Sequence, residues 1–235
     1  MNPITPLTNR ILSSLPPVER DILLSQAEYV VVRPGQMLAE PGEAPAAAFF
    51  PDRGAFCWIG DMSTGHHVAV AMVGADGLIG ISSLLNISRH TFRVVSLLES
   101  SGYRMSTESL RRAFDGFEYF RTGVLEYVGR QIVEISSNVA CNRIHSHRQR
   151  LARWLLMMAD KSGTQSLKIT HDVLAQVVGG PRHAVTIGLT KLRADDAIAH
   201  LRGRIDILDR TRLQRHACEC YVEPDWSYGS GGDLH

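Results

Sequence analysis

The stretch that decides the fold is ITHDVLAQVVGGPRHAVTIGLTKL, residues 169–192. Thr170 stands where a helix over Asp172–Val178 needs a cap, because its hydroxyl can accept from a free backbone N–H of the first turn. Gly179 can adopt the positive φ of a tight turn. Pro181 suits the first turn of a second helix, where its missing N–H costs nothing. Two short helices joined by a glycine turn predict a helix-turn-helix.

Small and apolar residues at fixed offsets predict how these two helices pack. Ala175 is small enough to let the second helix approach closely, and Val185, ten residues later, would fill the angle between the helices. Further buried positions are expected at Leu174, Val178, Leu189 and Leu192.

Polar residues on the exposed side of the motif are the candidate contacts to DNA. If the second helix enters the major groove, its N-terminal residues face the base edges. Arg182 is the best candidate base reader, since a guanidinium can bond O6 and N7 of guanine together. Residues 199–208 read as a strand, a turn and a strand, which predicts a basic wing after the helix. The candidate DNA-binding residues are Thr170, Arg182, His183, Thr186, Lys191, Arg202 and Arg204.

Charge is distributed unevenly along the chain. The formal net charge is +1, yet residues 143–216 hold 14 Lys and Arg against 6 Asp and Glu, while residues 1–142 contain no lysine. A basic segment that coincides with a helix-turn-helix favours an acidic partner, with double-stranded DNA the first candidate. From the charge alone, the alternative interpretation is a basic surface that binds no ligand.

The N-terminal half has a different residue pattern, in which short β-like runs are separated by glycine and proline. Their spacing of about 8–12 residues predicts an antiparallel barrel or sandwich. Strands are expected at Tyr29–Arg33, Ala47–Phe50, Ala55–Ile59, His67–Val73, Phe92–Leu98 and Gly102–Met105.

A long helix is predicted from Glu118 to His145. Apolar residues recur along it at spacings of 3, 4, 3 and 4, which is the pattern of a coiled-coil seam. Such a stripe can pack against its own domain or against an identical helix, and its narrowness favours the identical helix and hence a homodimer. The stripe consists of Leu125, Val128, Ile132, Ile135 and Val139.

Taken together, these features resemble the Crp/Fnr family of bacterial transcription regulators. The resemblance is carried by Gly35, Pro41-Gly42-Glu43, Phe50 and Gly54, by the run from Cys141 to Leu156, and by Leu174–Gly179 with Arg182. It implies an α+β chain with a cyclic-nucleotide-binding-like β-roll at 1–117, a dimerisation helix at 118–145, a winged helix-turn-helix at 146–222 and a flexible tail at 223–235. It also implies a dimer on a palindromic operator, with RNA polymerase as a further partner.

The segment that corresponds to the family's effector pocket departs from the cyclic-AMP pattern. Ala75 or Asp76 stands near the position of the glutamate that binds ribose, and His90 follows Arg89 where a serine is needed for the phosphate. These departures disfavour cyclic AMP and leave the effector unknown; no cofactor is predicted. The candidate effector residues are Gly77, Leu78, Arg89, His90 and Ser136.

Other chemistries compete with the regulator as explanations of the sequence. Residues 1–56 contain no cysteine, which excludes an N-terminal iron–sulfur centre. Cys218 and Cys220 with His216 form a weak candidate metal or redox site, for which structural or incidental use is favoured. The rival class is a metal-dependent, cupin-like β-barrel enzyme using His66, His67 and His90, but adjacent histidines on a strand point to opposite faces.

Nothing else in the sequence points to catalysis or to a membrane. There is no nucleophile elbow or phosphate loop, so the protein is not expected to be an enzyme. No apolar run approaches the roughly 20 residues that span a bilayer. Four cysteines in 235 residues do not form a disulfide framework, which favours a reducing, cytoplasmic location.

Overall fold

The computed structural model describes residues 7–62 and 67–224. Two short helices, α1 (Arg10–Ser13) and α2 (Pro17–Ser25), precede the first strand. Pro17 is the first residue of α2, where its missing N–H costs nothing because the first turn needs no N–H from that residue. Among the described residues, no helix is long and apolar enough to cross a membrane.

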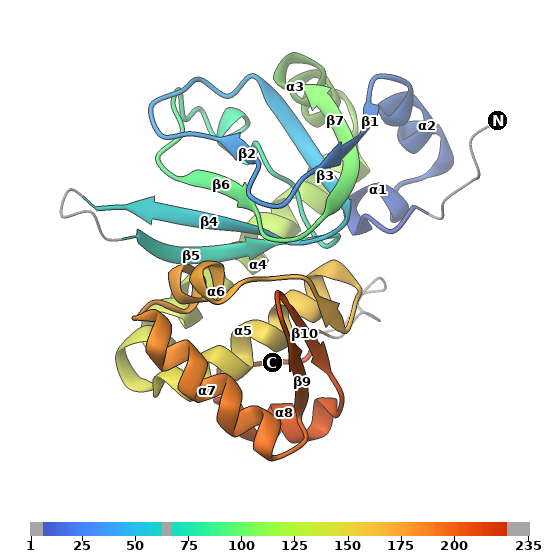
Figure 1. The fold of residues 1–235 in the computed structure, drawn as a ribbon. Coiled ribbons are helices and arrows are strands. Elements are labelled where there is room, and N and C mark those ends of the chain that lie inside the picture. Colours follow the sequence, from blue (N-terminus) through green and yellow to red (C-terminus); the bar gives the residue numbers. More distant parts are fainter. Residues whose placement is uncertain (1–6, 63–66, 225–235) are drawn as a thin grey trace.

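The N-terminal half is an antiparallel β-roll of two sheets, as predicted (Figure 1). One sheet has the order β1-β7-β3 and the other β2-β6-β4-β5. The strands are β1 (Glu28–Val32), β2 (Met37–Ala39), β3 (Ala47–Arg53), β4 (Phe56–Asp61), β5 (His67–Val73), β6 (Arg93–Ser96) and β7 (Ser100–Ser106), with a 3-10 turn η1 at Ile81–Ser83.

Two details of the roll differ from the sequence expectation. Strand β2 was not predicted, because three residues are too few to show an alternating pattern. Strand β3 does not end at Phe50 but continues to Arg53 through a register shift between Pro51 and Arg53. A bulge of this kind accommodates a proline that cannot donate to the ladder.

Two helices follow the roll. α3 (Thr107–Gly116) begins after Ser106, whose hydroxyl accepts from the backbone N–H of Ser109. The long helix α4 (Glu118–Ile144) then runs behind the β4–β5 sheet (Figure 1). One face of α4 is buried against the rest of the chain, through Phe120, Val124, Tyr127, Gln131, Asn138 and Cys141.

The C-terminal part is a winged helix-turn-helix. α5 (His147–Ser162) starts with a capping box of Ser146 and Gln149 and ends at Gly163, whose φ is 71°. It is followed by β8 (Ser166–Leu167), α6 (His171–Val178), α7 (Arg182–Ala194), β9 (Ile198–Leu201), β10 (Arg204–Ile207) and α8 (Arg210–His216), with the three strands in the order β8-β10-β9.

The two parts share one hydrophobic core. Met72 and Ile59 of the roll belong to the same buried cluster as Trp154 of α5 and Val177 of α6. As a result α6 lies against β5, and α7 lies on the side of α6 that faces away from the roll (Figure 1).

A buried ion cluster joins the roll, α4 and α5. The ammonium of Lys161, whose side chain is 9% exposed, lies 2.7 Å from Asp76 and 2.8 Å from Glu134. Glu134 also accepts from the backbone N–H of Met72 at 2.9 Å. Burial alone would lower the pKa of Lys161, but the two carboxylates outweigh it and raise the pKa above its ordinary value.

Candidate nucleic-acid interface

The helix-turn-helix has the predicted internal geometry. The hydroxyl of Thr170 accepts from the backbone N–H of Val173 at 3.3 Å, which caps α6. Gly179 takes a φ of 72° in the turn. α7 begins at Arg182, one residue later than expected, with Pro181 in an extended conformation just before it. The residues expected in the core, Leu174, Val178, Val185, Leu189 and Leu192, are all buried.

The N-terminal end of α7 is open to solvent. Arg182 and His183 are exposed, and Ile187 on the same side is 54% exposed. The guanidinium Nε of Arg182 lies 3.4 Å from Asp172 at the start of α6, with both side chains more than half exposed. Because exposed pairs of this kind contribute little, the guanidinium can exchange Asp172 for a base edge or a phosphate.

Thr186 belongs to a polar chain that sequence reasoning missed. Its hydroxyl donates to the carbonyl of Arg182 at 3.2 Å and lies 3.1 Å from Nδ1 of His171. The other ring nitrogen of His171 lies 2.9 Å from Nε2 of His200 on β9. This chain connects α6, α7 and the wing. Burial, then the neighbouring His200 and Arg182, lower the pKa of His171.

The wing carries the two arginines that the sequence placed at its tip. β9 and β10 are joined by a turn in which Gly203 takes a φ of 72°. Arg204 is held by Asp206, at 2.9 Å, on its own strand. Within the described ranges, neither Arg202 nor Lys191 forms an ion pair, and both are exposed.

A groove of about 400 Å³ runs along the outer side of α7. Its second wall is the start of α5, which brings Arg148 alongside Lys191. Sequence reasoning did not single out Arg148, because the start of α5 carries no motif and lies 35 residues from the start of α7. The lining residues are Ser146, His147, Arg148, His183, Ala184, Ile187, Gly188 and Lys191.

The basic surplus of residues 143–216 is only partly at the surface. Arg153 is 3% exposed and Lys161 is 8% exposed, so neither can meet a phosphate. Arg210 is paired with Asp160 at 2.5 Å. Counting charges along the chain therefore overstated the cationic surface, although Arg148, Lys168, Arg182, Lys191, Arg193, Arg202, Arg204 and Arg215 remain exposed.

At most of its positions, the apolar stripe of α4 does not pack against the rest of its own subunit. Leu125 is 52% exposed, Ile132 60% and Val139 68%. Val128 and Ile135 are half-buried at the edge of the stripe. The face that packs against the roll lies one residue further round the helix, so the stripe is left on the surface.

The five effector candidates do not form a common cluster of contacts. Gly77 packs on the ring of Tyr127, where an added Cβ would lie 2.5 Å from a ring carbon, and Leu78 is fully buried. Arg89 is exposed and donates to the carbonyl of Gly42 at 2.6 Å. His90 lies 3.4 Å from the hydroxyl of Ser82.

Ser136, the fifth candidate, is exposed on α4, where its hydroxyl donates to the carbonyl of Ile132 at 2.8 Å. A ligand at Gly77 would have to displace Tyr127, which is fully buried. The grouping of these five residues as an effector pocket stays a prediction from the sequence.

Of the three histidines of the cupin-like alternative, the two that the structure describes have different partners. His67 lies 2.6 Å from Asp61 on the neighbouring strand. His90 is in a loop, where its backbone pairs with that of Glu43. His66 lies outside the described residues, as does the predicted tail beyond residue 224.

The histidine expected beside the C-terminal cysteines is the wrong one. His216 does not join Cys218 and Cys220, because its Nε2 lies 2.9 Å from Asp195 at the end of α7. The two cysteines lie instead beside Cys141 and a different histidine.

Comparison with known proteins identifies the C-terminal part at the level of a domain family. Residues 149–216 match the Crp-like helix-turn-helix domain. Comparison of the sequence with curated proteins finds no significant match.

Solved structures share the fold of the whole chain. A CRP-family transcriptional regulator from Thermus thermophilus is 20% identical and aligns with a TM-score of 0.67 over 80% of this chain and 96% of that one. FixK2 from Bradyrhizobium japonicum is 14% identical, with a TM-score of 0.69 over 82% of this chain and 98% of its own. The c-di-GMP-responsive regulator CLP from Xanthomonas campestris is 12% identical, with a TM-score of 0.65 over 81% and 98%.

Proposed function

We propose that the protein is a sequence-specific, DNA-binding transcription regulator, because residues 149–216 match the Crp-like helix-turn-helix domain and the whole chain has the Crp/Fnr fold. The observation that carries this proposal is the open N-terminal end of α7. Arg182 and His183 are exposed to solvent at this end, and the wing arginines belong to the same domain.

Each candidate residue has a defined place in the proposed complex. Arg182 reads a guanine in the major groove, and His183 contacts a base or a phosphate beside it. Thr186 acts through the polar chain to His171 as well as through its own hydroxyl. Thr170 holds the start of α6. Lys191 and Arg148 from the groove, and Arg202 and Arg204 from the wing, contact the sugar–phosphate backbone.

The active form in this proposal is a homodimer. The exposed stripe of α4 supplies apolar residues at coiled-coil spacing that the subunit does not bury itself. Two copies paired through α4 present two α7 helices, which suits a palindromic operator with half-sites about one helical turn apart. RNA polymerase is the expected protein partner of such a regulator.

Selection from random double-stranded DNA tests this function. The purified chain should enrich a palindromic sequence, and the logarithm of its affinity for that sequence should fall linearly with the logarithm of salt concentration. A scrambled duplex of the same length and composition is the control. Failure to enrich any sequence, or equal affinity for the enriched and scrambled duplexes, would contradict the proposal.

A further inference from the structure

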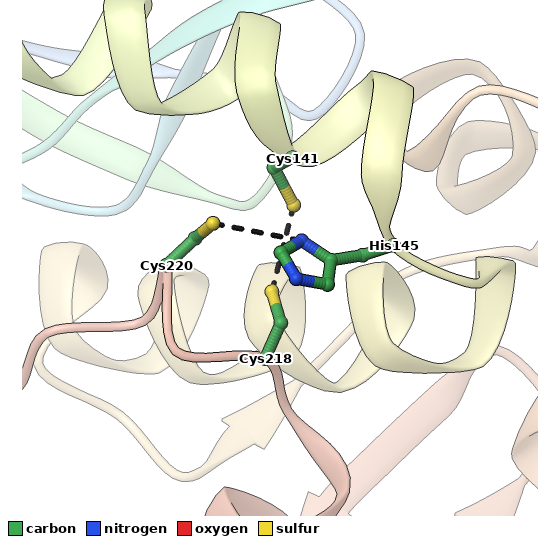
Figure 2. A group of neighbouring side chains, drawn as sticks. All are labelled: Cys141, His145, Cys218 and Cys220. Carbon is green, nitrogen blue, oxygen red and sulfur yellow. Dashed lines mark hydrogen bonds between the residues drawn. The ribbon is translucent and has the colours of Figure 1, made fainter.

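Four side chains with metal-ligating atoms meet where the C-terminal segment crosses the end of α4 (Figure 2). Cys141 and His145 are one helical turn apart at the end of α4, so they point the same way. Cys218 and Cys220 come from the turn after α8, in which the N–H of Tyr221 donates to the carbonyl of Cys218 at 2.9 Å. Cys141 and Cys218 are buried, and the side chain of His145 is 8% exposed.

The separations of the four ligand atoms suit one shared tetrahedral ion. The sulfurs of Cys141 and Cys218 are 3.5 Å apart, the sulfur of Cys220 is 3.6 Å from Nδ1 of His145, and all four atoms lie within 4.8 Å of one another. With Zn–S bonds of about 2.3 Å, a tetrahedral zinc ion places two thiolate sulfurs about 3.8 Å apart. An iron–sulfur cluster distributes its four protein ligands over two or four irons, so ligand atoms on different irons lie further apart than these.

A carboxylate orients the histidine. Nε2 of His145 lies 3.0 Å from the carboxylate of Glu219, so this nitrogen carries the proton and donates it. Nδ1 is then the unprotonated nitrogen, and it lies 3.6 Å from the sulfur of Cys220 (Figure 2). Metal-bound histidines typically donate their second N–H to a carboxylate in this way, which fixes the tautomer and the ring orientation.

A buried arginine beside the cluster supplies matching charge. Arg153 is 3% exposed and donates to the carbonyl of Cys220 at 3.1 Å and to the side-chain oxygen of Asn138 at 2.6 Å. No carboxylate forms an ion pair with it in the part of the chain that the structure describes. Three thiolates, a neutral imidazole and a divalent ion carry a net charge of −1, which the guanidinium balances.

The turn that carries two of the ligands is held by contacts outside the cluster. The hydroxyl of Tyr221 donates to Asp160 of α5 at 2.8 Å. Arg210 of α8 bonds both Asp160 and Tyr221. The cysteines are therefore brought to α4 by the fold itself, which leaves the site pre-organised for an ion.

We propose that Cys141, His145, Cys218 and Cys220 bind one Zn²⁺ ion per chain in a tetrahedral Cys₃His site. The ion fixes the segment after α8 to the end of α4, next to the break between α4 and α5. The α4–α5 break links the long helix to the DNA-binding domain, so the site is a structural clamp at that junction.

Metal titration of the full chain tests the site. The chain, purified with reductant and stripped with a chelator, is titrated with Zn²⁺ against a chromophoric competitor and with Co²⁺ as a spectroscopic substitute. We expect one equivalent of either metal, with tetrahedral d–d bands and thiolate-to-cobalt charge transfer for Co²⁺. A stoichiometry far below one, an octahedral Co²⁺ spectrum, or iron and sulfide in the isolated protein would each overturn the proposal.

Substitutions of the proposed ligand residues test where the ion binds. Cys220→Ser and His145→Gln should each lose the tight site and weaken the charge-transfer or d–d bands. Cys220 is only partly buried, so the Cys220→Ser variant has the better prospect of folding, which circular dichroism checks. The matched control is Cys57→Ala, because Cys57 is the one cysteine outside the cluster. Unchanged Zn²⁺ affinity in Cys220→Ser, or loss in Cys57→Ala alone, would refute the assignment.

Two further measurements complete the test. Glu219→Gln keeps a partner for His145 without the charge and should weaken Zn²⁺ binding about 10–100-fold while leaving the stoichiometry at one. Peptide mapping of protein isolated without reductant should find all four cysteines as thiols. A mapped disulfide between Cys141 and Cys218 would show that the pair serves as a redox link, and the zinc proposal would fall.

Discussion

Among single residues, Arg182 is the one whose removal should weaken sequence-specific binding to DNA while leaving non-specific binding to DNA nearly unchanged. In Arg182→Ala we expect a loss of about 1–3 kcal/mol in binding to the selected operator, because a bidentate guanine contact is removed. Binding to scrambled DNA should change little. Fluorescence anisotropy on both duplexes measures the difference.

Lys191→Ala is the matched comparison for Arg182→Ala, since both are exposed cations on α7. Because we propose that Lys191 contacts a phosphate, its removal should weaken binding to every duplex alike and reduce the salt slope by about 1. If Arg182→Ala instead behaves like Lys191→Ala, with preference for the operator retained, α7 does not read bases through Arg182.

His171 should make stability depend on pH. The pKa of His171 lies below its ordinary value of 6.5, so the unfolded chain binds a proton more readily than the folded one. As the pH falls below about 6.5, the free energy of unfolding should therefore decrease, whereas above that pH His171 contributes no dependence. Burial also lowers the pKa values of His90 and His147, with the same sign.

Urea unfolding at pH 7.5 and 5.5 checks this dependence. His171→Gln should show a smaller loss of stability between the two pH values than the parent chain, because the variant lacks an imidazole whose protonation the folded state disfavours. An equal loss in the two proteins would place the pH dependence elsewhere.

At the scale of elements, we expect the exposed stripe of α4 to determine the oligomeric state. Ile132 is 60% exposed at the centre of the stripe. In Ile132→Glu we expect monomers in sedimentation velocity, because a dimer would bury a carboxylate of each chain in an apolar seam. Tyr119→Glu is the control, since Tyr119 is 64% exposed on the same helix but outside the stripe. A dimer that survives Ile132→Glu would mean that the subunits meet through another surface.

The helices and strands that the sequence predicts well are those with local signals. Thr170 acts within one turn of the residue it caps, so the start of α6 is found to within a residue. The apolar run of β5 likewise lies within seven residues. The three-residue strand β2 has no such signal, and its existence depends on pairing with β6.

The parts of the site that the sequence did not reveal depend on contacts between distant residues. His171 and His200 are 29 residues apart, and Cys141 and Cys218 are 77 apart. Sequence proximity suggested His216 as the partner of the C-terminal cysteines, but α8 turns it toward Asp195. The spacing of Cys141 and His145 was visible in the sequence, yet only the fold shows which segment faces it.

For the whole molecule, the shared core and the Lys161 cluster make the roll and the DNA-binding domain one cooperative unit. Lys161 is the cation between Asp76 of the roll and Glu134 of α4. In Lys161→Met the two carboxylates stay buried without a counter-charge, so we expect a loss of about 3–5 kcal/mol in the free energy of unfolding.

Urea unfolding followed by both tryptophan fluorescence and circular dichroism measures this loss, and a single coincident transition is expected for the parent chain. Lys168→Met removes the same charge from an exposed position and should change stability by less than about 0.5 kcal/mol. Asp76→Asn, Glu134→Gln and Lys161→Met combined should recover much of the loss, since no buried charge is then unpaired. If Lys161→Met is as stable as the parent, the ion cluster does not hold the two parts together, and the shared apolar core does so alone.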